Sequence, residues 1–364
     1  MSRRGQLSRV LALLLVVYAL PVTLLSQSGD ASLTSSGTAL SGSLGGPAAS
    51  RLGSGLSRLV PSSVMPSSPL GAPLAELPSP RPAAPVSPFT GLPADLAAPV
   101  LCVKIDNASV ARPQSGLELA DLVYVEPVEG GLSRLLAVFQ SRVPPVVGPV
   151  RSARASDVEL LANFGRQALA YSGAAPSVGA LVAAAPVADV SELARPGAYH
   201  RDRRRRMPHN LYGDPGQLRQ GGAPPRDIGF RFGPAPAGGN PVGEAGVSYP
   251  ATRIGVRWDA GERRWLISMD GAPLTSATGA RPGAATVVLQ RVSVRDAGVR
   301  DAAGSPSPFA ATVGSGDAVV LRDGLAFAGR WSRPSAEAIT TFTLSDGSPL
   351  TFAPGPVWVL LVPA

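Results

Sequence analysis

The sequence predicts an α+β protein, in which a mixed α/β N-terminal domain is followed by an antiparallel β-rich C-terminal domain. Short apolar runs alternate with helical patterns from about residue 100 to 220, and helical patterns are absent beyond about residue 250. Of the 364 residues, 45% are hydrophobic and 16% charged, which is typical of a chain with a buried core. This length exceeds one average domain and favours two.

Residues 1–28 have the pattern of a targeting segment. Arg3, Arg4 and Arg9 precede an apolar run at residues 10–25, as in a secretory signal. The run is short for a membrane-spanning helix, which needs roughly 20 residues, but long for a cleaved signal. We therefore expect either a signal peptide or an N-terminal membrane anchor. The protein is predicted to be extracytoplasmic, secreted or tethered to the outer face of the cytoplasmic membrane.

Residues 29–87 are rich in Ser, Gly, Ala and Pro and contain few charges. This composition predicts a disordered tether, which is more extended in its Pro-rich second half.

The N-terminal domain is predicted to span residues 88–220. Apolar runs predict strands at residues 100–105, 122–128, 135–139 and 168–171, and helical patterns occur at residues 157–164 and 177–185. The single cysteine, Cys102, lies in the first run and is expected to be a buried thiol.

A Gly- and Pro-rich connection is predicted at residues 221–249, with a small ordered piece around Phe230 and Phe232. The C-terminal domain then spans residues 250–364. Strands are expected at residues 252–258, 264–269, 286–294, 318–321, 325–331, 340–344 and 357–362. Asp-Gly turns between several of them favour antiparallel pairing.

Positive charge is concentrated in one short segment. The formal net charge is +8, and residues 199–208 contain five arginines against Asp202. A general nucleic-acid binder spreads basic residues over a whole face, so no nucleic-acid partner is expected. The run Arg203–Arg206 is either a solvated loop or a contact for anionic lipid headgroups or acidic wall polymers.

Several local strings are not explained by periodicity, and together they resemble the YerB-like family of bacterial exported proteins. In the N-terminal half they are VKIDN (103–107), ARPQSGL (111–117), ADLVYVEPVEGG (120–131), SRLLAVFQS (133–141), VGPVRSAR (147–154) and MPHNLY (207–212). In the C-terminal half they are VGSGDAVVLRDG (313–324), GRW (329–331), TTF (340–342) and PGPVWVLLVP (354–363). The resemblance covers residues 88–363.

The resemblance implies export but no defined biochemical activity, because the family is a domain of unknown function. Many of its members look like lipoproteins. This chain departs from them because no cysteine follows the apolar run at residues 10–25. The run Arg203–Arg206 is also more basic than the family pattern.

Several kinds of chemistry are excluded by the motifs. Lys104 is the only lysine and does not follow a glycine, so a P-loop is absent, as are H-E-x-x-H and G-x-S-x-G. One cysteine and two histidines do not supply a structural zinc site. We expect no metal site and no cofactor.

The candidate acid/base residues are Asp106, Glu126, Glu129 and His209. Asp106 and Asn107 end the first predicted strand, where they either contact a ligand or form a turn. Glu126 and Glu129 reach one site only if Pro127 or the following glycines bend the chain. Otherwise they form ion pairs with Arg134 or Arg151.

A candidate ligand site combines arginines with polar residues near the family-like strings. The guanidinium groups of arginine suit carboxylate or phosphate ligands. The alternative is that these arginines form internal ion pairs with the acidic residues nearby. The predicted ligand-binding residues are Asp106, Asn107, Arg112, Arg134, Arg151, Arg154, His209 and Asn210.

Two functions follow from these residues. The first is a non-catalytic envelope module that binds an anionic or sugar-containing ligand, such as a wall polymer or glycan. The second is a hydrolase of envelope polysaccharide or peptide that uses Glu126 and Glu129, or Asp106, with His209 assisting. The sequence leaves open whether the protein is an enzyme.

Overall fold

A computed structural model describes residues 84–301 and 304–364, all of which belong to one compact unit. The predicted targeting segment and residues 29–83 of the predicted tether lie outside the described residues. In the remainder of that tether, Val86 forms a β-bridge with Pro93, and Ser87 is buried. None of the helices within the described ranges is long and apolar enough to cross a membrane.

The fold is more β-rich than the predicted α+β class. Strands account for 41% of the structure and helices for 14%. The connections between the first three strands contain short 3-10 turns in place of α-helices, because glycines and prolines interrupt them. These 3-10 turns and the later ones are η1 (Ser109–Ala111), η2 (Leu117–Leu119), η3 (Glu129–Gly131), η4 (Ala162–Phe164), η5 (Pro196–Ala198) and η6 (Arg219–Gly221).

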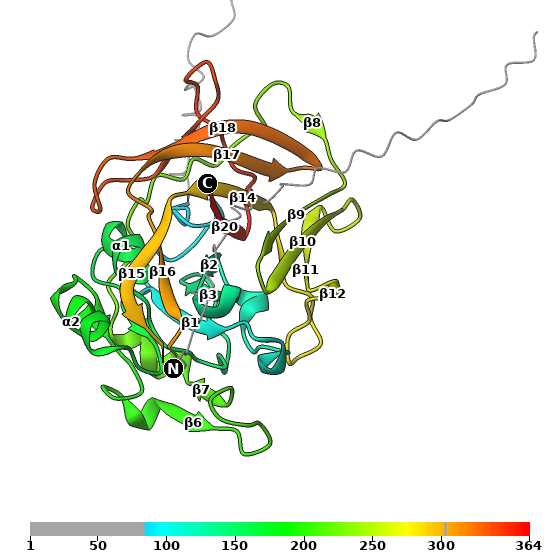
Figure 1. The fold of residues 1–364 in the computed structure, drawn as a ribbon. Coiled ribbons are helices and arrows are strands. Elements are labelled where there is room, and N and C mark those ends of the chain that lie inside the picture. Colours follow the sequence, from blue (N-terminus) through cyan, green and yellow to red (C-terminus); the bar gives the residue numbers. More distant parts are fainter. Residues whose placement is uncertain (1–83, 302–303) are drawn as a thin grey trace, which may run out of the picture. The chain divides into compact units, whose positions relative to one another are not determined.

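The largest sheet draws strands from both predicted domains (Figure 1). Its order is β19-β18-β17-β14-β20-β2-β3-β1-β4-β5, and β8 pairs with β18. The N-terminal half supplies β1 (Leu101–Asp106), β2 (Leu122–Pro127), β3 (Ser133–Phe139), β4 (Ala168–Ala170) and β5 (Ala188–Asp189). The C-terminal half supplies β8 (Asn240–Pro241), β14 (Thr286–Val292), β17 (Gly314–Arg322), β18 (Leu325–Arg333), β19 (Thr341–Thr343) and β20 (Val357–Pro363).

The strand β20 joins the two halves of this sheet. It lies between β14 and β2 and runs parallel to both. Its sequence VWVLLVP is almost continuously apolar and buried, as expected for a strand with both faces covered. The antiparallel pairing expected of the C-terminal half is found among β14, β17, β18 and β19, whereas β20 pairs in parallel.

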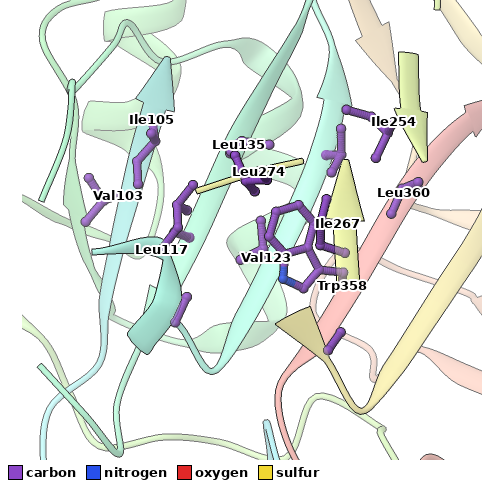
Figure 2. Close-up of a cluster of buried hydrophobic side chains, with 14 of the residues drawn as sticks. Val103, Ile105, Leu117, Val123, Leu135, Ile254, Ile267, Leu274, Trp358 and Leu360 are labelled. Atoms are coloured by element: carbon purple, nitrogen blue, oxygen red, sulfur yellow. The ribbon is translucent and has the colours of Figure 1, made fainter. Parts of the chain in front are cut away.

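A second sheet packs against one face of the first. It contains β9 (Glu244–Tyr249), β10 (Thr252–Asp259), β11 (Arg264–Met269), β12 (Ala272–Pro273) and β13 (Gly283–Ala284). Val123 and Trp358 of the main sheet share a buried apolar cluster with Ile254 and Ile267 of the second sheet (Figure 2). The strand β9 lies within the segment predicted as a connection, because Gly246 and the glycines and prolines on either side of β9 obscure the strand pattern.

The opposite face of the main sheet is covered by helices. These are α1 (Ala155–Leu161) and α2 (Pro176–Ala184). A third short helix, α3 (Pro215–Leu218), instead contributes Leu218 to the core shared with the second sheet. Leu160, Phe164 and Val178 pack in the cluster that also contains the buried Cys102. Helix α1 begins at Ala155, two residues before the helical pattern predicted at residues 157–164, and Arg154 is its N-cap residue.

Two hairpins complete the described fold (Figure 1). One pairs β15 (Val294–Arg300) with β16 (Pro306–Ala310), and the other pairs β6 (Tyr199–Arg201) with β7 (Leu211–Gly213). Neither hairpin was predicted from the sequence. The strands β6 and β15 are charged and largely exposed, so they lack the apolar alternation by which a strand is recognised.

Candidate functional site

Four charged residues lie on the same face of the main sheet. Val103 and Ile105 of β1 point into the core shared with the second sheet. Because side chains alternate along a strand, Lys104 and Asp106 face the opposite side, toward α1. Arg134 of β3 lies opposite both Asp106 and Glu126 in the strand register. The folded sheet therefore gathers charges that the sequence separates.

Lys104 and Glu126 form a fully buried cluster with Asp157 of α1. The Lys104 Nζ atom lies 2.6 Å from Asp157 Oδ1 and 3.0 Å from Glu126 Oε2, and all three side chains are almost completely buried. Burial and the negative charge of Asp157 raise the pKa of Glu126, and Lys104 offsets only part of this effect. Glu126 thus lies in a structural cluster out of contact with solvent.

Glu129 makes a separate ion pair with Arg154. Arg154 donates from Nε to Oε1 at 2.5 Å and from Nη2 to Oε2 at 2.7 Å, and Ser307 Oγ also donates to Oε1. Burial opposes ionisation, but the hydrogen bonds from Arg154 and Ser307 outweigh it and lower the pKa of Glu129 to about 2. The two glutamates therefore contact different basic side chains, Glu126 that of Lys104 and Glu129 that of Arg154.

Asp106 joins Arg151 to His209. Its Oδ2 atom lies 3.0 Å from Arg151 Nε and 2.7 Å from His209 Nδ1, while Oδ1 accepts a hydrogen bond from the backbone N–H of Ala108 at 3.1 Å. Asp106 is buried and His209 is partly exposed. The carboxylate therefore orients the imidazole ring and leaves Nε2 as its second proton-transfer atom.

Three of the predicted ligand-binding arginines line one cavity of about 540 Å³. They are Arg134, Arg151 and Arg154, which the cavity combines with Arg300, Asp301, Glu129 and an apolar wall. Burial and the neighbouring charges of Arg154 and Arg151 lower the pKa of Arg134 to about 10, even though Glu129 and Asp106 lie nearby. Burial is the larger cause of this lowered pKa, and the nearby guanidinium groups of Arg154 and Arg151 add to it.

The other predicted ligand-binding residues either line a second cavity or make internal hydrogen bonds. Arg112 bonds to Asp270 at 2.7 Å and to the backbone oxygen of Asn107 at 2.8 Å. It lines a second cavity of about 560 Å³, together with His209. Asn107 is buried and donates to Ser133 Oγ. Asn210 is also buried and donates to two backbone oxygens.

Arg300 and Ser307 were not identified from the sequence. Both lie on the β15–β16 hairpin and line the cavity that contains Glu129. Ser307 Oγ bonds to Glu129 across a sequence separation of 178 residues. No local signal in the sequence connects the hairpin with this cavity.

Two family models match this chain. The N-terminal domain of a protein of unknown function (DUF3048) matches residues 89–228, and the C-terminal domain of the same family matches residues 246–359.

A sequence and a solved structure, both named YerB and both from Bacillus subtilis, are similar to this chain. The protein named putative lipoprotein YerB, from strain 168, is 50% identical over 64 residues. This match covers 18% of this chain and 19% of the relative, so the chain spans about a fifth of the relative's length. The crystal structure of YerB protein has a TM-score of 0.62 at 25% identity, over 77% of this chain and 97% of that chain.

Proposed function

This chain belongs to the YerB-like (DUF3048) family, and we propose that it is an exported cell-envelope module that binds an anionic or sugar-containing ligand without transforming it. The ligand site in this proposal is the cavity lined by Arg134, Arg151, Arg154 and Arg300.

The observation that carries this proposal is the crowding of guanidinium groups in one cavity. Like charges held together in a partly buried site destabilise one another, and a bound anion relieves this repulsion. The fork of an arginine side chain also suits the paired oxygens of carboxylate or phosphate. Arg154 is already paired with Glu129, and the Nε atom of Arg151 with Asp106. The groups proposed to meet the ligand are therefore Arg134, Arg300 and the Nη atoms of Arg151.

The apolar side of the cavity favours a ligand with a sugar ring. Ala175, Pro176, Val178 and Val299 line this side. Such a wall packs against the C–H faces of a ring while the arginines contact its acidic substituents. Sugars that carry carboxylate or phosphate groups, as in wall polymers and glycans, meet both requirements.

The proposed location rests on the N-terminal sequence pattern and on the relatives. The similar Bacillus subtilis protein bears the name putative lipoprotein YerB. This chain has the basic and apolar pattern of an export signal at residues 1–28 but no cysteine directly after it. We therefore propose that residues 1–28 direct export of the protein. This segment is then either cleaved or retained in the membrane.

A second candidate function is hydrolysis of envelope polysaccharide or peptide. It is favoured by the contact of 2.7 Å between Asp106 Oδ2 and His209 Nδ1, because a carboxylate-oriented imidazole is a common general base. Glu126 is a poor participant in such a reaction, since it is buried against Lys104 and does not line the cavity that contains Glu129.

Isothermal titration tests the binding proposal directly. The purified protein is titrated with glycerol-phosphate wall polymer, with an acidic glycan and with a neutral glycan. We expect the acidic ligands alone to bind, and Arg300→Gln to weaken binding about tenfold because one charge-assisted hydrogen bond is lost. Arg330→Gln, on the exposed part of β18, is the matched control.

The outcomes separate the two functions. If none of these polymers binds to the folded protein, the binding proposal fails. If wall polysaccharide or peptide is cleaved, and His209→Gln abolishes cleavage but retains binding, the hydrolase is the correct function.

A further inference from the structure

A second basic site lies at the end of the β6–β7 hairpin. We call the residues from 201 to 210 the basic hairpin. Within it, Arg203 and Arg206 are exposed and form no ion pair in the described part of the chain. Arg204 has 90% of its side chain exposed and pairs with Asp202 in the same turn. The hairpin therefore presents several guanidinium groups to solvent.

Hydrogen bonds hold the basic hairpin in a defined conformation. Arg205 donates from Nη1 and Nη2 to the backbone oxygens of Ala111 and Pro113, both at 2.9 Å. Asn210 donates from Nδ2 to the backbone oxygens of Asp202 and Arg205. His209 is bonded to Asp106 at the base of the loop. The arginines thus project from a preorganised loop, which lowers the entropy cost of binding a ligand.

Apolar side chains stand beside these charges. Met207 is 68% exposed and Val110 is 67% exposed, and both are among the large apolar side chains that the structure leaves in solvent. They line the cavity of about 560 Å³ together with Arg112 and Arg204–Arg206. Guanidinium groups and the exposed apolar side chains of Met207 and Val110 therefore line the same cavity.

We propose that the basic hairpin binds the headgroups of anionic phospholipids at a membrane surface. The cavity receives a headgroup phosphate, and the exposed arginines contact neighbouring headgroups. Met207 and Val110 reach the boundary with the acyl chains. This inference concerns a different cavity from the ligand site proposed above and does not depend on it.

The exposed side chains of Met207 and Val110 favour a lipid surface over a soluble polyanion as the partner. Both partners are attracted to the arginines, with a strength that falls as the salt concentration rises. A soluble polyanion gains little from contact with Met207 and Val110. A bilayer, by contrast, buries these side chains in its interfacial region, where apolar burial adds to the electrostatic attraction.

Vesicle co-sedimentation with the full-length protein tests this proposal. Vesicles of phosphatidylcholine, with or without phosphatidylglycerol, are compared for each variant, so that any binding by the N-terminal segment to neutral lipid is measured separately. In the variant Arg203→Gln with Arg206→Gln, we expect affinity for the anionic vesicles to fall roughly twentyfold.

The controls distinguish this site from general charge attraction. Arg263→Gln with Arg330→Gln removes the same charge from exposed positions elsewhere and should change the affinity by less than about threefold. Met207→Ser with Val110→Ser should weaken binding to anionic vesicles several-fold, with an unchanged circular dichroism spectrum. All four substituted positions of the two arginine variants are exposed, so folding should be retained.

Two outcomes overturn the inference. If the two arginine variants lose affinity equally, the attraction is non-specific. If the arginines matter but the Met207 and Val110 substitutions have no effect, the site is a contact for a soluble polyanion and not for a lipid surface.

Discussion

At the scale of single residues, Lys104 accounts for the burial of two carboxyl groups. It is the only lysine in the chain, and it lies between Asp157 and Glu126 in the interior. Asp157 also accepts a hydrogen bond from the backbone N–H of Arg154 at the start of α1. Because burial and Asp157 raise the pKa of Glu126, we expect Glu126 to be protonated near neutral pH, beside the ion pair of Lys104 and Asp157. The net charge of the three side chains is then zero.

Lys104→Met should be strongly destabilising, because it leaves the carboxylate of Asp157 buried without its cation. We expect the free energy of unfolding to fall by about 3–5 kcal/mol. Urea denaturation followed by tryptophan fluorescence measures this change.

Glu126→Gln is the matched comparison for that prediction. The amide has the shape of the protonated acid and keeps a donor for Asp157 and an acceptor for Lys104. Its cost should be about 1 kcal/mol or less near neutral pH. Equal losses in the two variants would show that Glu126 is ionised and contradict this assignment.

At the scale of secondary-structure elements, the Glu129 carboxylate connects three elements through hydrogen bonds and an ion pair. It links η3 to Arg154 at the start of α1 and to Ser307 of β16. The chain turns back after Glu129 through Gly130 and Gly131, which have φ values of 67° and 71°. Such left-handed conformations favour glycine and bring β3 alongside β2.

This junction should weaken in acid. The pKa of Glu129 is lowered from 4.5 to about 2, so the folded state favours the ionised carboxyl group. Its contribution is present above about pH 4.5 and is lost as the pH falls toward 2, with a total of about 3 kcal/mol. Unfolding free energies measured in urea between neutral and acidic pH should show this loss.

Glu129→Gln serves as the reference for the acid effect. The variant should be less stable than the natural protein at neutral pH, and the difference between them should shrink as the pH falls. A difference that stays constant down to acidic pH would contradict the proposed role of the ion pair.

At the scale of the whole molecule, the described chain is joined by one continuous sheet. Because β20 pairs with both β14 and β2, strands of the N-terminal and C-terminal halves share backbone hydrogen bonds. The second sheet adds a core to which both halves contribute (Figure 2). The regions matched by the two family models therefore both contribute strands to one sheet.

The two halves should unfold together. All four tryptophans lie at residues 258–358, so their fluorescence reports on the C-terminal half. Hydrogen exchange of β1 and β3 reports on the N-terminal half. We expect both signals to give the same urea midpoint. Two separated midpoints would show that the halves are independent domains.

The strongest local patterns in the sequence predicted the centre of this fold well. Strands near residues 100–105, 122–128 and 357–362 were expected, and β1, β2 and β20 are found there, because these apolar runs are rich in valine and too short for typical helices. The β6–β7 and β15–β16 hairpins were missed because β6 and β15 are charged and exposed and therefore have no such pattern.

The sequence alone determined the apolar runs that form the central strands, the buried Cys102 and the family-like strings around Asp106, Glu129 and His209. Only the tertiary structure decided that Arg134, Arg151 and Arg154 meet Arg300 in one cavity, while Arg112 and His209 line another. Alternation along a strand is set by neighbouring residues and can be read locally. Ion pairs and cavities depend on contacts between segments such as residues 129 and 307, which only the folded chain brings together.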